Sequence, residues 1–295
     1  MSKIIENTGI GGFNFSDKSR ETLSDIFKRI MNRGIYGISF SAYIEGQGPG
    51  SQLSEEQIRR RMALIQPYVT WVRSFSCTEG NEIIPRIAHE FGLKTLVGAW
   101  IGDDEEKNLN EIDELIKVAK SGHADMIAVG NEVRLRGDLS EDAVVAHMKE
   151  VKNAVPDIPL GYVDAYYQFP LNPKITELCD VIMANCYPFW EGYPLEHALV
   201  YMKQMYAIAV KAANGKPVII TETGWPNIGQ PVKTAAIPSY ENALKYFINT
   251  YLWAEEDQVN IIYFSSFDET WKVDAEGDVG ANWGLWDKDH KMKFV

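Results

Sequence analysis

The chain has 295 residues, of which 45% are hydrophobic and 24% are charged, as in an ordinary globular protein. Its net charge of −12 has the wrong sign for neutralising phosphates, so we expect no nucleic-acid partner. No apolar run is long enough to cross a bilayer, so no membrane span is expected either.

The cysteines and histidines predict neither a disulfide framework nor a metal site. The three cysteines are irregularly spaced without a CxxC pair, and the five histidines show no HExxH or other ligand spacing. We therefore expect buried free thiols, no metal and no cofactor.

The first nine residues, MSKIIENTG, lack the basic region and apolar core of a signal peptide. The chain as written is expected in the cytoplasm, or in the periplasm or outside the cell if a signal sequence has been removed. Residues 17–33 then read as an amphipathic helix, with Leu23, Phe27 and Ile30 on one side. We expect this helix to pack near the first and last predicted strands, because no helical pattern follows the last strand.

Short apolar runs rich in β-branched and aromatic residues alternate with helical patterns along the rest of the chain. The predicted strands are 37–43, 69–75, 94–100, 126–132, 160–166, 181–187, 218–224 and 260–266. The predicted helices between them are 54–66, 80–92, 109–121, 140–154, 195–213 and 239–255. Eight strands with intervening helices favour a (β/α)8 TIM barrel of the α/β class, formed as a single domain over residues 1–295. A doubly wound sheet is the alternative, but no glycine-rich phosphate loop follows the first strand.

Acidic and amide side chains stand where several predicted strands end. Asn131 and Glu132 close the fourth strand, Glu222 lies near the end of the seventh, and Glu269 follows the eighth. The carboxyl ends of barrel strands meet at one mouth, and two converging carboxylates suit cleavage of a glycosidic bond. A single glutamate after a strand is more often an ion-paired or capped strand end, so position alone leaves both readings open.

Five motifs together give the chain a specific resemblance to glycoside hydrolase family 17, the β-1,3-glucanase family, from about residue 37 to 290. They are VGNEV (129–133), NCYPF (185–189), ITETGWP (220–226), FDETWK (267–272) and GLWDKD (284–289). The resemblance implies a retaining enzyme whose acid/base is Glu132, on strand 4, and whose nucleophile is Glu222, on strand 7.

Further roles follow from the same resemblance. It implies that Asn131 hydrogen-bonds the 2-hydroxyl of the reacting sugar and that Tyr187 helps to keep the nucleophile ionised. Glu269 and Lys272 resemble an accessory pair near the acid/base, with a buried ion pair that fixes the last loop as the structural alternative. Arg73 resembles an arginine that supports the catalytic floor, and a purely structural role is equally compatible.

Aromatic residues near the strand ends are the expected sugar-binding surface, because sugar rings pack their C–H faces on flat side chains. The candidates are Tyr166, Phe189, Trp190 and Trp225, together with Tyr187. Any one of them could instead be core packing.

The predicted activity is hydrolysis of β-1,3-linked, laminarin-like β-glucan, polysaccharide or oligosaccharide, by a monomer. The Gly-rich loop 44–53 and the segment after Tyr187 resemble microbial members of the family, some of which transfer glucan chains through the same intermediate. Transglycosylation is therefore the first alternative. The alternative of another class is a non-catalytic glucan-binding barrel.

Overall fold

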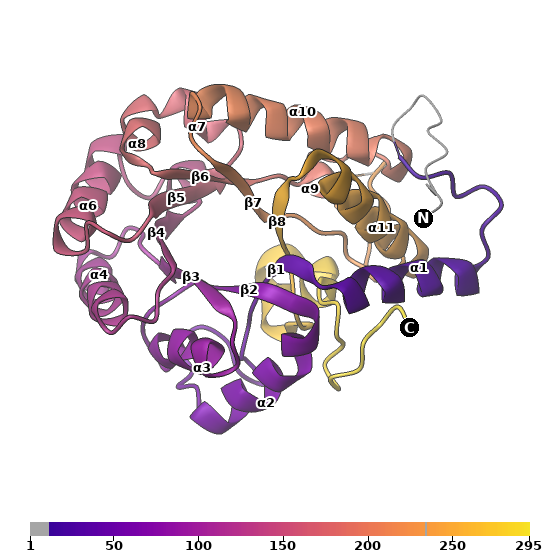
Figure 1. Ribbon diagram of the computed structural model, residues 1–295, viewed down its shortest axis with the longest axis horizontal. Helices are drawn as coiled ribbons and strands as arrows, with labels where there is room; N and C mark the ends of the chain where they lie inside the picture. The colour runs from indigo at the N-terminus through magenta and orange to yellow at the C-terminus, as the bar shows by residue number, and fades with distance from the viewer. Residues whose placement is uncertain (1–11, 234) are drawn as a thin grey trace.

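A computed structural model describes residues 12–233 and 235–295 of the chain and shows a closed eight-stranded barrel (Figure 1). Each strand pairs in parallel with the next, and β8 returns to β1. The predicted TIM barrel is therefore confirmed. The strands are β1 (Ile35–Ser39), β2 (Val69–Ser74), β3 (Lys94–Ala99), β4 (Met126–Asn131), β5 (Leu160–Ala165), β6 (Val181–Asn185), β7 (Val218–Glu222) and β8 (Asn260–Tyr263).

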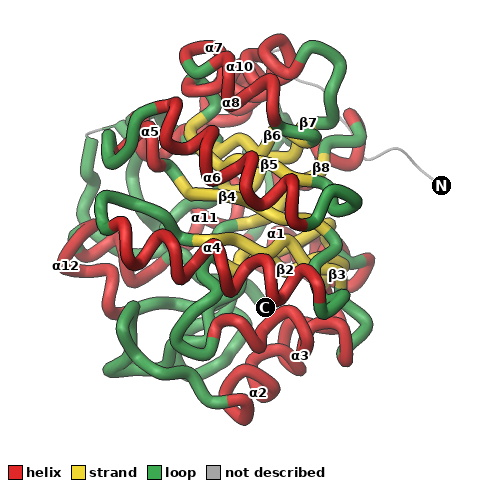
Figure 2. Tube along the Cα trace, turned by 90° about the vertical axis from the view of Figure 1, so that its left-hand side faces the viewer, coloured by secondary structure: helices red, strands yellow, loops and turns green. Residues whose placement is uncertain are grey.

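Helices surround the barrel, and those of six residues or more are α1 (Arg20–Arg33), α2 (Glu55–Ile65), α3 (Ile84–Glu90), α4 (Glu105–Lys120), α6 (Glu141–Ala154), α8 (Pro173–Leu178), α10 (Leu195–Ala213) and α11 (Tyr240–Asp257). Shorter helical turns are α5 (Val133–Arg136), α7 (Gln168–Leu171), α9 (Pro188–Glu191), α12 (Val273–Glu276), η1 (Gln66–Tyr68), η2 (Asn81–Ile83), η3 (Thr270–Lys272) and η4 (Asp278–Asn282). In the side view of Figure 2, long loops gather at the left, where α5 and α12 lie.

Side-chain caps explain where several helices begin. Ser54 and Gln57 form the reciprocal capping box that their spacing predicts at the start of α2. The predicted helix 109–121 starts earlier, at Glu105, because the Asp104 side chain accepts a hydrogen bond from the Lys107 N–H. Each strand ends one to four residues before its predicted apolar run does.

Helix α1 begins at Arg20, where the Ser19 side chain accepts a hydrogen bond from the Thr22 N–H. It packs against α11, which precedes β8, and against η1, which precedes β2. Phe27 of α1 contacts Phe247 of α11 and Phe294 near the C-terminus. After β8 the chain forms only η3, α12 and η4.

Apolar side chains fill the interior below the mouth. One buried cluster draws on strands β3 to β8, and partly buried Tyr36 and Trp71 extend it to β1 and β2. Its members are Leu96, Met126, Ala128, Val163, Val181, Met183, Ile219 and Ile262. Because this layer closes the barrel, polar residues nearer the strand ends are held at the mouth.

All three cysteines, Cys77, Cys179 and Cys186, are buried free thiols, as predicted. Within the described ranges, no helix combines the length and the apolar character needed to cross a membrane.

Candidate active site

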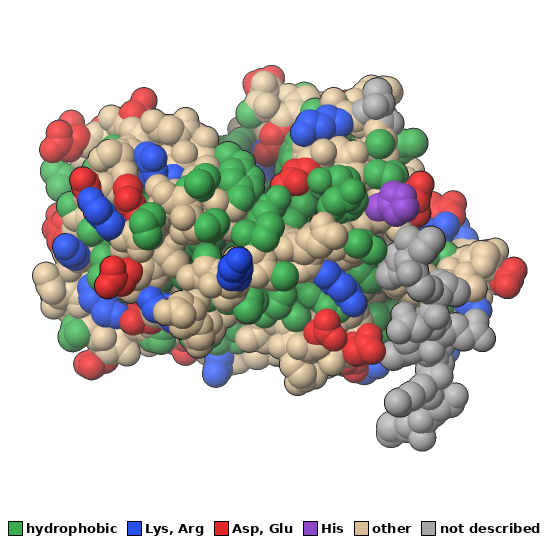
Figure 3. All heavy atoms as spheres, turned by 90° about the horizontal axis from the view of Figure 1, so that it is seen from above, with side chains coloured by type: hydrophobic (Ala, Val, Ile, Leu, Met, Phe, Trp, Pro, Cys, Tyr) green, Lys and Arg blue, Asp and Glu red, His purple; other side chains and the backbone are tan. Residues whose placement is uncertain are grey.

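A cavity of about 520 Å³ lies at the carboxyl ends of the strands. It is lined by side chains from the ends of β4 to β8 and from the loops and short helices that follow them: Glu132, Leu135, Ala165, Tyr166, Tyr167, Asn185, Tyr187, Trp190, Glu191, Glu222, Lys233, Phe264 and Glu276. In Figure 3 the surface is hollowed at its upper edge, and hydrophobic side chains gather around the hollow. The cavity brings the two predicted catalytic glutamates together.

Glu222 is the last residue of β7, and both of its carboxylate oxygens accept a hydrogen bond. Arg73 of β2 donates from Nη1 to Oε1 at 2.7 Å, and the phenolic O–H of Tyr187 donates to Oε2 at 2.9 Å. The Glu222 residue is only 6% exposed, so these donors replace lost water. The arrangement stabilises an ionised carboxylate that is already aligned inside the cavity.

Arg73 also ties together the two strands that carry the glutamates. Its Nη2 donates to the side-chain oxygen of Asn131 at 2.6 Å, and its Nη1 donates to the carbonyl of Thr221 at 3.1 Å. Since the Asn131 amide oxygen is occupied by this bond, the side chain offers its N–H groups to other acceptors. Arg73 therefore links β2 to the ends of β4 and β7, and it also places a positive charge beside the Glu222 carboxylate.

Glu132 follows β4 in a left-handed backbone conformation, with φ 54°. The Asn185 side chain donates to its Oε1 at 2.9 Å. Burial, and after it the neighbouring carboxylate of Glu222, raise the pKa of Glu132 to about 7, while the Asn185 hydrogen bond opposes both. At neutral pH a substantial fraction of Glu132 is therefore protonated, as a proton donor must be. Glu222, in contrast, lies between two hydrogen-bond donors, as an ionised nucleophile requires.

Glu269 and Lys272 form a buried ion pair at 2.6 Å. They do not line the cavity. The Lys272 ammonium lies 4.0 Å from the ring centroid of Phe264, which is a cavity residue. The pair therefore supports one wall from behind.

The aromatic candidates divide into wall and core. Tyr166, Tyr187 and Trp190 line the cavity. Phe189 and Trp225 do not, and their residues are 1% and 2% exposed. Their rings pack on each other at 5.2 Å and the Trp225 indole donates to the Ile237 carbonyl, so in this structure neither ring offers the cavity the surface expected of a sugar platform. They pack beneath the wall that Trp190 forms.

Four polar residues line the cavity that the sequence patterns did not predict as site residues: Asn185, Glu191, Lys233 and Glu276. Asn185 ends β6 within the NCYPF motif, just as Asn131 ends β4, so its position at a strand end was a usable signal. Glu276 lies in a short helical turn with no preceding strand pattern. Burial raises its pKa, with a smaller contribution from the charge of Glu269.

Among the described residues, no group of three or more histidine, cysteine, aspartate or glutamate side chains is placed to hold a metal ion.

Comparisons with known proteins agree with this geometry. Residues 37–284 match the family model described as the BtgE/BtgC glycoside hydrolase domain. A "Glucan 1,3-beta-glucosidase" from Arthroderma benhamiae is 29% identical over 78% of this chain and 80% of its own length. A "Cell surface mannoprotein" from Candida albicans is 25% identical over 86% of this chain and 67% of its own.

One solved structure similar to this chain is a glycoside hydrolase family 17 β-1,3-glucanosyltransferase from Rhizomucor miehei. It is 28% identical, with a TM-score of 0.80, and the match covers 89% of this chain and 96% of that one.

Proposed function

Because the chain belongs to the BtgE/BtgC glycoside hydrolase domain family, we propose that it cleaves β-1,3-glucosidic bonds of a laminarin-like β-glucan with retention of configuration. The resemblance to glycoside hydrolase family 17 is confirmed by the similar solved structure of that family. The observation that carries the proposal is the pairing, in one cavity, of Glu222 between two donors and Glu132 with a raised pKa.

The first step is attack by Glu222 on the anomeric carbon. Its carboxylate forms the bond to the sugar while Glu132 donates its proton to the departing glycosidic oxygen. The second step reverses the role of Glu132, which takes a proton from water as that water displaces Glu222 from the sugar. After the second step Glu222 is again a free carboxylate and Glu132 is again protonated, so the cycle can repeat.

The neighbouring residues fit supporting roles. Asn131 would donate to the sugar 2-hydroxyl, because Arg73 already occupies its amide oxygen. Arg73 and Tyr187 would hold the nucleophile in place and ionised. Trp190 and Tyr166 would offer aromatic surface to sugar rings, and the Glu269–Lys272 ion pair would fix the wall behind Phe264.

Transglycosylation is the second candidate, and the name of the Rhizomucor miehei enzyme favours it. The glycosyl-enzyme is the same in both reactions, and a glucan hydroxyl replaces water in the second step. The ratio of transfer products to new reducing ends, measured on linear β-1,3-glucan with and without added oligosaccharide acceptor, separates the two.

We also propose that the chain acts as a single catalytic domain and a monomer, without a cofactor, with α1 taking the place of a helix after β8. The expected cytoplasmic location finds no support among the relatives. Of the alternative locations, outside the cell or in the periplasm, the one outside the cell is compatible with the name of the Candida albicans relative.

Removal of each glutamate tests the roles. Glu222→Ala should abolish turnover, and azide should restore reaction of an activated glycoside to give a product of inverted configuration. Glu132→Ala should keep the first step for an activated substrate, and azide should then give a glycosyl azide of retained configuration.

Glu56→Ala is a suitable control, because Glu56 is an exposed carboxylate in the first turn of α2 and does not line the cavity. Wild-type activity in both glutamate variants on unactivated glucan would rule out the two-carboxylate mechanism. A wild-type protein that binds glucan but yields neither reducing ends nor transfer products would be the non-catalytic binding barrel.

A further inference from the structure

The turn that carries Glu132 is held in a conformation that a non-glycine residue rarely adopts. Glu132 has φ 54°, and the single helical turn α5 begins directly after it. A left-handed residue other than glycine is sterically strained, so the surrounding structure must supply compensating contacts. The orientation of the Glu132 carboxyl thus depends on whatever fixes this turn.

A second buried carboxylate, Asp164 of β5, supplies contacts on one side of the turn. Its Oδ2 accepts the backbone N–H groups of Arg134 and Leu135, at 3.2 and 3.4 Å, and its Oδ1 accepts the Ala165 N–H at 2.8 Å. The Tyr162 hydroxyl donates to Oδ2 and also accepts the Arg134 N–H at 2.9 Å. Asp164 is 0% exposed and does not line the cavity.

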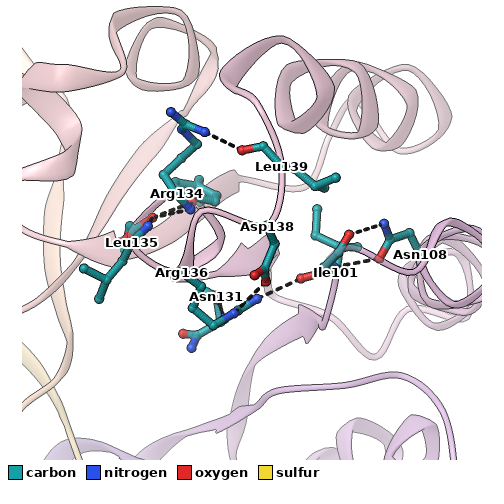
Figure 4. Close-up of polar contacts among 11 residues, drawn as sticks. Ile101, Asn108, Asn131, Arg134, Leu135, Arg136, Asp138 and Leu139 are labelled. Carbon is teal, nitrogen blue, oxygen red and sulfur yellow. Dashed lines mark hydrogen bonds and ion pairs between the residues drawn. The ribbon is translucent and has the colours of Figure 1, made fainter.

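The other side of the turn is fixed by Arg136, as Figure 4 shows. Its guanidinium donates to the Asn131 carbonyl and, at 3.0 Å, to the carbonyl of Ile101 beyond β3. It also pairs with Asp138 at 2.7 Å. Asp164 and Arg136 therefore hold the turn between the ends of β5 and β3.

The charges that act on Glu132 come from several strands. Glu222 and Asp164 are the neighbouring carboxylates that disfavour its ionised form, and Arg73 favours that form. Tyr167 and Tyr187 also face these carboxylates, as neutral phenols whose pKa values are raised, first by burial. Four hydrogen-bond donors reach the Asp164 carboxylate and oppose the effect of burial on its own pKa.

We propose that Asp164 is a positioning residue for the glycosidic reaction: its hydrogen bonds fix the turn that carries Glu132, and they hold a second negative charge beside that turn. This inference rests on the proposed function, in which Glu132 is the proton donor. It assigns a role to a buried side chain that touches neither the substrate nor the cavity.

Two variants separate the charge of Asp164 from its hydrogen bonds. Asp164→Asn removes the charge but keeps an oxygen that can accept the Arg134 and Leu135 N–H groups. Tyr162→Phe keeps the charge and removes the hydroxyl that bridges Asp164 and Arg134. Asp180→Asn is the matched control, because Asp180 accepts the Leu160 N–H at 2.9 Å at the opposite end of β5.

The readout is the pH dependence of kcat/KM on β-1,3-glucan, whose basic limb reports loss of the acid's proton in the free enzyme. In Asp164→Asn a negative charge is lost, so the pKa of Glu132 falls and the basic limb moves to lower pH by about 0.5 unit. In Tyr162→Phe the limb stays in place while kcat falls roughly tenfold through misplacement of Glu132. In Asp180→Asn both the limb and kcat remain those of the wild type.

An unshifted basic limb in folded Asp164→Asn would overturn the electrostatic part of the inference, and wild-type kcat in Tyr162→Phe would overturn the positioning part. If Asp164→Asn does not fold, Tyr162→Phe alone decides, because wild-type kcat there contradicts the proposal. A wild-type protein without any turnover would instead refute the proposed function. The two failures are therefore distinguishable.

Discussion

The guanidinium of Arg73 lies 2.7 Å from Glu222 Oε1, and both side chains are almost completely buried, at 2% and 8% exposure. The pair joins the end of β2 to the end of β7 across the barrel mouth. A buried ion pair of this kind gains little over an apolar pair, but removing one partner leaves an unpaired charge. The main contribution of the Arg73–Glu222 ion pair is therefore to hold the Glu222 carboxylate in position.

Arg73→Ala should lose activity and stability together. The change leaves Glu222 without its cation and Asn131 without its donor, and we expect a loss of about 3–5 kcal/mol in the free energy of unfolding. Arg73→Lys keeps the charge but lacks the planar fork that reaches both partners, so it should retain more stability than activity. Urea unfolding and kcat/KM, measured on both variants, check this; an Arg73→Ala protein as stable and active as the wild type would contradict it.

Asn185→Ala should move the basic limb of kcat/KM to higher pH. The Asn185 amide donates to Glu132 Oε1 and favours the ionised form, so its removal raises the pKa of Glu132 further above about 7. The direction is opposite to that expected for Asp164→Asn. Profiles of the two variants recorded in the same buffers provide the comparison, and a limb displaced to lower pH in Asn185→Ala would refute the assignment.

Glu132→Gln should stabilise the protein at alkaline pH only. The pKa of Glu132 is about 7 in the folded chain and 4.5 for an ordinary glutamate, so between these values the folded state holds the proton more tightly. The wild type therefore loses stability as pH rises through this window, by up to about 3 kcal/mol, whereas the glutamine variant does not. Urea unfolding of both proteins at pH 4.5 and pH 8 measures the difference, which should be near zero at the lower pH.

Trp190→Ala and Trp225→Ala should affect different properties. Trp190 is half-buried at the cavity, so its loss should raise KM for glucan while leaving the fold intact. Trp225 is buried, and its truncation should cost about 3–5 kcal/mol of folding free energy. Thermal unfolding and KM are measured for both variants; an unchanged KM in Trp190→Ala would remove that residue from the proposed sugar-binding wall.

The repeating pattern of apolar runs and helical segments was sufficient to predict the barrel. Strand and helix formation respond to local periodicity and capping, as at Ser54 and Gln57, so both could be inferred without tertiary information. The meeting of Glu132 and Glu222 at one mouth could also be predicted, because strand ends in a parallel barrel converge. Their separate roles came from the motifs that resemble glycoside hydrolase family 17 and not from strand position.

Only the tertiary structure decided which side chains face the cavity and which lie behind it. Phe189 directly precedes Trp190 and Trp225 follows β7, yet Phe189 and Trp225 pack into the core while Trp190 lines the cavity, because the direction of a side chain after a strand end depends on the loop that follows. The role proposed for Asp164 could not be predicted from the sequence either. Its contacts reach Arg134 and Leu135, some thirty positions earlier in the chain, and such long-range hydrogen bonds leave no local pattern.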